Sequence, residues 1–157
     1  MNNNLSTEKS SLFDIIEVND TKFKNWEEII DYLQDIFVSN GYATEDYFQY
    51  IKKDLVENDF YMLILPGLVL LHSAPEHGAI KNAFHFMKLS NPINFGSHIN
   101  NPVHICITFS AISSDNHIQS IQKIAYMLMN KNFVNEIKNA DSLEKIKEII
   151  KNNEDKY

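Results

Sequence analysis

The chain has 157 residues, of which 44% are hydrophobic and only four are glycine and four proline, a composition typical of one packed globular domain. Its net charge of -7 results from 21 acidic and 14 basic side chains, and every basic residue is a lysine. Without arginine, the chain lacks the side chain that most often recognises guanine and pairs with phosphates, so nucleic-acid binding is not expected. The composition also disfavours a disordered, collagen-like or repeat protein.

The N-terminus and the cysteine content indicate where the protein works. Residues 1–10 are polar and predict a disordered N-terminal tail, which leaves residues 11–157 as a single domain. The longest apolar run, residues 61–71, is about half as long as a membrane span. The first residues also lack the apolar centre of a signal peptide. The lone Cys106 excludes an intrachain disulfide and fits a reducing compartment, so we expect a cytoplasmic protein.

Apolar periodicity predicts two helices in the first third of the chain. In residues 26–37 the apolar side chains recur at steps of three and four, and Asn40-Gly41 follows where a left-handed cap is expected. Residues 45–57 fit a second helix with Thr44 as its N-cap.

The middle of the chain changes to short apolar runs and alternating patterns, which are typical of strands. The segment 91–102 contains proline, glycine and several asparagines, so we expect it to be a loop. A short edge strand is expected before the first helix. The predicted strands are residues 13–18, 61–65, 68–71, 84–89 and 103–109.

Three further helices are predicted after the strands. The run Ser113-Ser114-Asp115 supplies N-cap chemistry for the first, and two short helices follow at residues 133–137 and 143–150. The inward-facing positions expected for the first helix are Ile118, Ile121, Ala125 and Leu128. The order of elements predicts an α/β fold in which helices cover both faces of a sheet.

Six histidines raise the possibility of a metal site, because imidazole is the commonest transition-metal ligand. Their spacings do not support it, since HExxH and CxxC motifs are absent and Pro75 interrupts the step from His72 to His77. The G-x-S-x-G motif of serine hydrolases and the glycine-rich phosphate-binding loops are also absent. We therefore expect no metal and no bound cofactor. His85 and His104 fit sheet positions, and His98 lies in the predicted loop.

Two histidines stand where an anion could bind. His72 follows a buried strand, beside backbone N–H groups that no strand partner uses. A histidine held there by a backbone carbonyl, with no functional role, is the alternative. His117 falls in the first turn of a predicted helix, where the helix dipole disfavours its protonated form and favours a neutral imidazole that can donate to a phosphate.

Three separated segments carry a family resemblance: residues 61–68 (YMLILPGL), 71–84 (LHSAPEHGAIKNAF) and 113–121 (SSDNHIQSI). Together they resemble the enzyme IIA component of bacterial sugar phosphotransferase systems, of the mannitol and fructose type, and in particular its ascorbate-specific subgroup. The resemblance extends from about Leu12 to Ile150. It implies a mixed sheet between two helical layers.

The resemblance also implies a phosphoryl relay without a cofactor. In that family a histidine, here His72, takes a phosphoryl group from the phosphocarrier protein HPr and passes it to a cysteine of enzyme IIB, which serves the membrane component IIC. The second active-site histidine corresponds to His117. Partners are expected to dock on an apolar rim formed by Leu70, Leu71 and the loop 91–102. The residues expected to help stabilise the phosphoryl group are Ser73, Glu76, His77, Lys81 and Asp115.

Two positions depart from the family pattern. Leu71 stands where a proline usually precedes the active histidine, and Ala74 stands where ascorbate-type sequences carry an arginine. The site then either works with fewer donors or belongs to a divergent regulatory module that controls a partner by phosphorylation or anion binding. A metal-dependent enzyme that uses several of the histidines is the third and weakest alternative.

Overall fold

The computed structural model describes residues 12–154, so the predicted tail over residues 1–10 lies outside the described residues. Five strands form one mixed sheet in the order β1-β4-β5-β3-β2, in which β1/β4 and β3/β5 are parallel pairs. The other two pairings, β4/β5 and β2/β3, are antiparallel. The elements are β1 Ile15–Asn19, α2 Trp26–Ser39, α3 Glu45–Glu57, β2 Leu63–Leu65, β3 Leu68–Leu71, η1 Pro75–His77, β4 Ala83–Ile93, β5 Val103–Ser110, α4 Ser114–Met127, α5 Phe133–Asn139 and α6 Leu143–Glu154.

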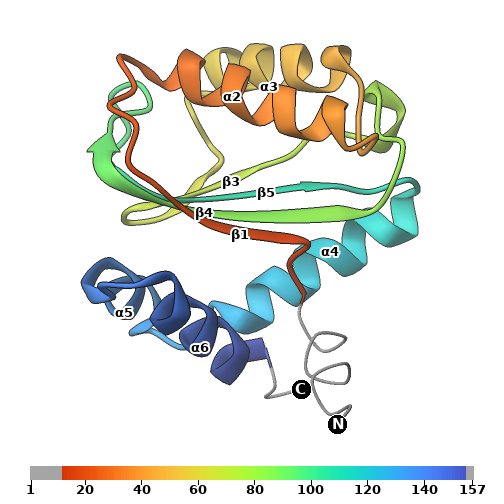
Figure 1. The fold of residues 1–157 in the computed structure, drawn as a ribbon. Coiled ribbons are helices and arrows are strands. Elements are labelled where there is room, and N and C mark those ends of the chain that lie inside the picture. Colours follow the sequence, from red (N-terminus) through yellow and green to blue (C-terminus); the bar gives the residue numbers. More distant parts are fainter. Residues whose placement is uncertain (1–11, 155–157) are drawn as a thin grey trace, which may run out of the picture.

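Helices cover both faces of the sheet, which confirms the predicted α/β fold. Figure 1 shows α2 and α3 above the sheet and α4, α5 and α6 below it. Because successive side chains in a strand point to opposite faces, each strand feeds two cores. In β3, Val69 and Leu71 join the core under α2 and α3, whereas Leu68 and Leu70 join the core over α4 to α6. No helix within residues 12–154 is long and apolar enough to span a bilayer.

The first two helices begin and end close to their predicted bounds. The side chain of Asn25 accepts a hydrogen bond from the backbone N–H of Glu28 at the start of α2, and Gly41 takes a positive φ of 71° just after its end. Thr44 has the extended backbone of an N-cap, but its hydroxyl makes no capping bond. Its backbone N–H donates instead to the carbonyl of Gly78, so Thr44 joins the start of α3 to a distant turn.

The strand bounds differ from the expectation at one place. The predicted loop over 91–102 begins later than expected, because β4 continues to Ile93 after an irregularity in its pairing with β5. The Ile93–Val103 pair re-forms the ladder beyond that irregularity. Alternation predicted the regular half of β4 and missed the half beyond the register shift.

The buried stripe of α4 was predicted wrongly. Ile118 and Ile121 are exposed, at 55% and 37%, and the helix buries Ser120, Ile124 and Met127 instead. Two stripes of this helix carry apolar residues at steps of three and four, so periodicity alone does not distinguish them. The same stripe reaches the half-buried His117, the fourth residue of α4, at the N-terminal end of the helix.

Candidate functional site

The candidate site lies where β3 and β5 end at the same edge of the sheet. These strands are parallel, and their last pair is Leu71 with Thr108, so His72 and Phe109 follow side by side. The imidazole of His72 stacks on the ring of Phe109, with centroids 5.1 Å apart and planes at 9°. His117, in the first turn of α4, brings its ring centroid to 5.5 Å from that of His72. The structure therefore brings together the two histidines that the sequence singled out.

A backbone hydrogen bond determines which nitrogen of His72 carries the proton. The Nδ1 atom lies 2.9 Å from the carbonyl oxygen of Leu70. A carbonyl oxygen only accepts, so Nδ1 must donate, and Nε2 keeps its lone pair. The backbone bond that a purely structural histidine would make therefore leaves the far nitrogen available as a nucleophile.

Burial keeps both rings of the site neutral. Desolvation lowers the pKa of His72 below its ordinary value of 6.5, and the neighbouring His117 lowers it further. Desolvation also lowers the pKa of His117, which the carboxylate of Glu76 partly offsets. The Nδ1 atom of His117 is buried and has no hydrogen-bond partner within residues 12–154. The site thus combines a neutral nucleophile with a neutral second imidazole.

A buried tyrosine fixes the backbone just after His72. The Tyr47 hydroxyl, from α3, accepts a bond of 3.0 Å from the backbone N–H of Ser73. It donates across the strand ends to the carbonyl oxygen of Phe109 at 2.8 Å, with the carbonyl of Ser73 at 3.2 Å. Burial raises the pKa of Tyr47, so the hydroxyl stays protonated. Tyr47 falls within the helix predicted over residues 45–57, and no local pattern indicates that its hydroxyl reaches the site.

A comparison with protein-family models identifies the family of this chain. The family model described as "Phosphoenolpyruvate-dependent sugar phosphotransferase system, EIIA 2" matches residues 13–153. This chain belongs to that family. Proteins of this kind are phosphoryl carriers of sugar transport systems, and the resemblance inferred from three short segments is confirmed over nearly the whole described chain.

Individual relatives come from two branches of the IIA family. The mannitol-specific cryptic phosphotransferase enzyme IIA component of Escherichia coli (strain K12) is 29% identical over 127 residues, covering 81% of this chain and 86% of that protein. The ascorbate-specific EIIA component of Salmonella typhi is 33% identical over 92 residues, covering 59% of this chain and 60% of that protein. Both branches therefore match, the ascorbate-specific one over a shorter stretch.

Solved structures confirm the fold. The solution structure of the mannitol-specific cryptic enzyme IIA from Escherichia coli superposes with a TM-score of 0.80 at 27% identity, covering 92% of this chain and 97% of that one. A IIA mannitol protein in complex with phosphorylated enzyme IIB from the same organism superposes with a TM-score of 0.70 at 18% identity, covering 85% and 92%. The mixed sheet with helices on both faces is the mannitol-type IIA fold.

The other residues that the sequence singled out around His72 differ in their exposure and in their partners. Ser73 is buried, and its hydroxyl lies 2.7 Å from Nδ1 of His77. Glu76 is exposed and close enough to His117 to influence its pKa. Lys81 and Asp115 are exposed, and the N-cap of α4 is Ser113, whose side chain accepts from the backbone N–H of Asn116.

The docking rim expected of this IIA protein was placed wrongly. Leu70 and Leu71 are 4% and 0% exposed, and the loop 91–102 follows the end of β4 that is remote from His72. Exposed isoleucines lie instead on the segments that begin or end at this edge of the sheet, before β4, after β5 and in α4. They are Ile80, Ile112, Ile118 and Ile121, here called the isoleucine rim. Asn82 accepts a bond of 3.0 Å from the backbone N–H of Ile112, which joins the two loops of this rim.

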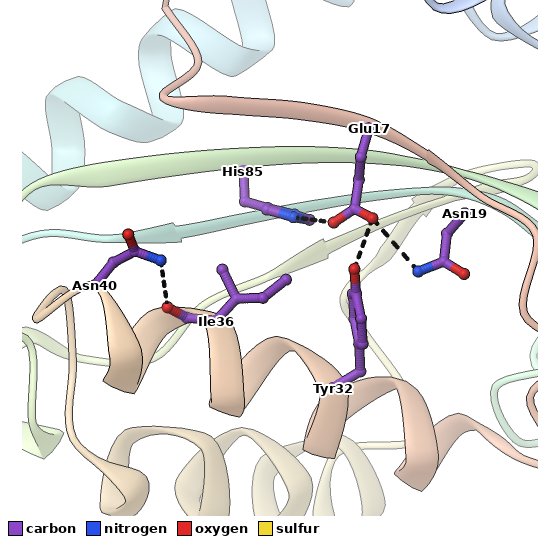
Figure 2. A network of polar contacts seen from close by, with 6 residues as sticks. All are labelled: Glu17, Asn19, Tyr32, Ile36, Asn40 and His85. Carbon is purple, nitrogen blue, oxygen red and sulfur yellow. Dashed lines mark hydrogen bonds and ion pairs between the residues drawn. The ribbon is translucent and has the colours of Figure 1, made fainter.

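The remaining histidines of this IIA protein are engaged elsewhere. His85 is 1% exposed, and its Nε2 lies 2.6 Å from the carboxylate of Glu17 on the α2 face of the sheet, as Figure 2 shows. Nδ1 of His98 accepts from a backbone N–H within its own turn. Burial and the charges of nearby lysines lower the pKa of His104. Within residues 12–154, no three His, Cys, Asp or Glu side chains converge as a metal site would require.

Proposed function

We propose that Nε2 of His72 accepts a phosphoryl group from phosphorylated HPr and passes it to a cysteine of an enzyme IIB protein during sugar uptake. The observation that carries the proposal is the hydrogen bond from Nδ1 of His72 to the carbonyl of Leu70, which leaves Nε2 as a neutral nucleophile beside His117. Family membership supports the same role, since IIA components relay phosphoryl groups.

The chemistry requires little beyond positioning. The bond between phosphorus and its donor breaks as a P–N bond forms at Nε2, and the ring acquires positive charge. That charge resides largely at Nδ1–H, where the carbonyl oxygen of Leu70 stabilises it. The stack on Phe109 holds the ring plane, so Nε2 meets the phosphorus atom in one direction.

Stabilisation of the phosphoryl oxygens is assigned to the side chains around the two rings. We assign His117 as the main hydrogen-bond donor to the phosphoryl oxygens, because its ring lies beside that of His72. Lys81, Ser73 and His77 are further donors in the same region of the chain. The carboxylate of Glu76 acts to raise the pKa of His117, which favours its donor form, and Asp115 lies two residues before His117 in the first turn of α4. With Ala74 where related proteins carry an arginine, these groups must act without a guanidinium.

The relatives and the surface of this protein support its proposed partners and substrate. The isoleucine rim gives HPr and IIB an apolar surface around His72, and a mannitol IIA of this fold forms a complex with phosphorylated IIB. The membrane component IIC takes part only through IIB. We propose an ascorbate-like substrate, supported by the 33% identity to an ascorbate-specific IIA, and mannitol is the alternative that the longer match supports.

The direct test is phosphorylation with purified HPr and the first enzyme of the cascade. Wild-type protein should take up an acid-labile, base-stable phosphate, and His72→Ala should take up none. His98→Ala, altered in a turn at the far end of the sheet, is the matched control and should behave as wild type. An unlabelled wild type beside a labelled control IIA, or equal labelling of His72→Ala, would refute the assignment.

The second candidate is a regulatory module that is phosphorylated but does not feed a transporter. Ala74 favours it, because a site with one fewer cation holds a phosphoryl group less strongly. Incubation of the phosphorylated protein with IIB partners distinguishes the two functions. Loss of the label to IIB supports transport, and a label that stays on His72 supports regulation.

A further inference from the structure

The turn that follows His72 contains a second pair of polar side chains. The Ser73 hydroxyl lies 2.7 Å from Nδ1 of His77, a short hydrogen bond between side chains four residues apart. The His77 ring stacks on Tyr50 of α3, with centroids 3.8 Å apart and planes at 10°. His77 is thus held on one side by a hydroxyl and on the other by an aromatic face.

This pair belongs to a turn that is pinned to the start of α3. Backbone N–H groups of Ile80 and Lys81 donate to the carbonyl of Tyr42, at 2.8 and 3.0 Å. The carbonyl of Gly78 accepts from Thr44 at 2.9 Å. Gly78 has a φ of 129°, and a Cβ there would lie 2.1 Å from the Thr44 hydroxyl, so only glycine lets the turn approach this closely.

Ser73 transmits the restraint to His72. Its side chain is 3% exposed, its backbone N–H donates to Tyr47, and its hydroxyl pairs with His77. Two atoms of the residue next to His72 are therefore bonded, one to α3 and one to the turn. The His72 ring itself stacks on Phe109, in the core over α4 to α6. The Ser73–His77 bond therefore acts on His72 through the backbone that joins Ser73 to it, and not by contact with the phosphoryl group.

We propose that His77 is a positioning residue for phosphoryl transfer: through its bond to Ser73 it fixes the backbone next to His72, so that Nε2 meets the incoming phosphorus atom in line. The inference rests on the proposed function and changes the role assigned there to His77 and Ser73, from donors to the phosphoryl group to supports of the nucleophile. Transfer of a phosphoryl group depends mostly on positioning, so a small shift of His72 lowers the rate.

Three substitutions separate the bond from the stack. Ser73→Ala removes the bond, and His77→Phe removes it while keeping a ring on Tyr50. His77→Asn keeps a polar atom close to the place of Nδ1 and restores the bond. We measure the maximal rate and the half-saturating HPr concentration for phosphorylation of each full-length variant, with His98→Asn as matched control and urea unfolding as a check that each variant is folded.

The expected pattern is a change in rate alone. Ser73→Ala and His77→Phe should each lower the maximal rate about tenfold, with the half-saturating HPr concentration unchanged. His77→Asn and His98→Asn should stay within about twofold of wild type. The double variant Ser73→Ala/His77→Phe should be no slower than either single variant, because both remove the same bond.

Three results would overturn the inference while leaving the relay intact. The first two are a wild-type rate in His77→Phe and a His77→Asn variant as slow as His77→Phe. The third is a double variant whose maximal rate falls by the product of the two single effects, since the two side chains would then act separately. If wild-type protein takes up no phosphate at all, the proposed function fails and the inference fails with it.

Discussion

Two imidazoles, the half-buried His72 and the buried His85, lie on opposite faces of one sheet and have opposite hydrogen-bonding patterns. On the α4 side, Nδ1 of His72 donates to a backbone carbonyl, and Nε2 keeps a free lone pair. On the α2 side, Nε2 of His85 is bound to the carboxylate of Glu17 at 2.6 Å. Figure 2 shows that the Glu17 carboxylate also accepts a hydrogen bond from the Tyr32 hydroxyl, at 2.7 Å, so His85, Glu17 and Tyr32 form one polar network, here called the Glu17 network.

The comparison shows that hydrogen bonding and exposure together decide how an imidazole can be used. The carbonyl at Nδ1 of His72 leaves Nε2 free on a half-buried ring, whereas Glu17 occupies Nε2 of His85, whose Nδ1 has no partner within residues 12–154 but is buried in a ring that is 1% exposed. His85 therefore joins β1, β4 and α2, a structural task, while His72 is available for chemistry. The Glu17 network also explains why the edge strand β1 stays attached beside α2.

Exchanging glutamine for each imidazole should give the largest effect and the sharpest contrast. His72→Gln should abolish phosphoryl acceptance from HPr, because an amide nitrogen is not a nucleophile. His85→Gln should keep acceptance and change the free energy of unfolding by less than about 1 kcal/mol, because the glutamine amide can still donate to the carboxylate of Glu17. Phosphorylation assays and urea unfolding of both variants measure the two effects. Acceptance by His72→Gln, or its loss in a folded His85→Gln, would contradict the comparison.

Removal of the second imidazole should have the next largest effect. His117→Ala should slow phosphorylation about thirtyfold, since a charge-assisted bond to a phosphoryl oxygen contributes about 2 kcal/mol. Single-turnover rates with HPr measure it, and His104→Ala at the far end of β5 is the control. An unchanged rate would show that the nearness of the two rings is only a packing contact.

Removing one hydrogen bond from the Glu17 network should have a smaller effect. Tyr32→Phe removes one of the bonds to the Glu17 carboxylate at the half-buried edge of the network, and should lower the free energy of unfolding by about 1 kcal/mol. Urea unfolding measures it. Tyr61→Phe is the control, since the Tyr61 hydroxyl makes no hydrogen bond within residues 12–154. Equal stability of both variants would mean that the Tyr32 bond does not help to hold β1.

Acid should destabilise the protein gradually, and the two regions should respond over different ranges of pH. Burial lowers the pKa of His72 and His117 below 6.5 in the folded state, so the unfolded chain binds protons first and stability falls as pH drops below about 6.5. Burial raises the pKa of Glu17, but the bonds from His85 and Tyr32 outweigh it, and the net pKa is below 4.5. Its stabilisation is therefore present above pH 4.5 and lost as pH falls through the folded pKa.

Urea unfolding at a series of pH values tests both ranges. His72→Gln should flatten the decline that begins near pH 6.5, and Glu17→Gln should flatten the one below pH 4.5. A wild-type stability that does not fall between pH 7 and pH 5 would contradict the histidine assignment, and one that shows no further fall as pH drops below 4.5 would contradict the Glu17 assignment.

Local pattern located the elements well and the contacts between them poorly. Strands and helices were predicted because their apolar periods are regular, yet the buried side of α4 was missed, since Ile118 and Ile124 both belong to apolar stripes. The docking rim was misplaced for a related reason: Leu71 is next to His72 in sequence but points to the opposite core. Burial of a given side chain depends on what the rest of the chain brings to it.

The sequence by itself determined the α/β class and the family, and it singled out His72 and His117, because apolar periods and short motifs are local properties of the chain. Only the tertiary structure decided that His72 keeps Nε2 free while His85 does not, and that Tyr47 and His77 hold the turn. Some of these bonds join atoms 26 to 68 residues apart in the sequence, and the bonds of His72 to Leu70 and of Ser73 to His77 span two and four residues; in each case packing sets the hydrogen-bond geometry.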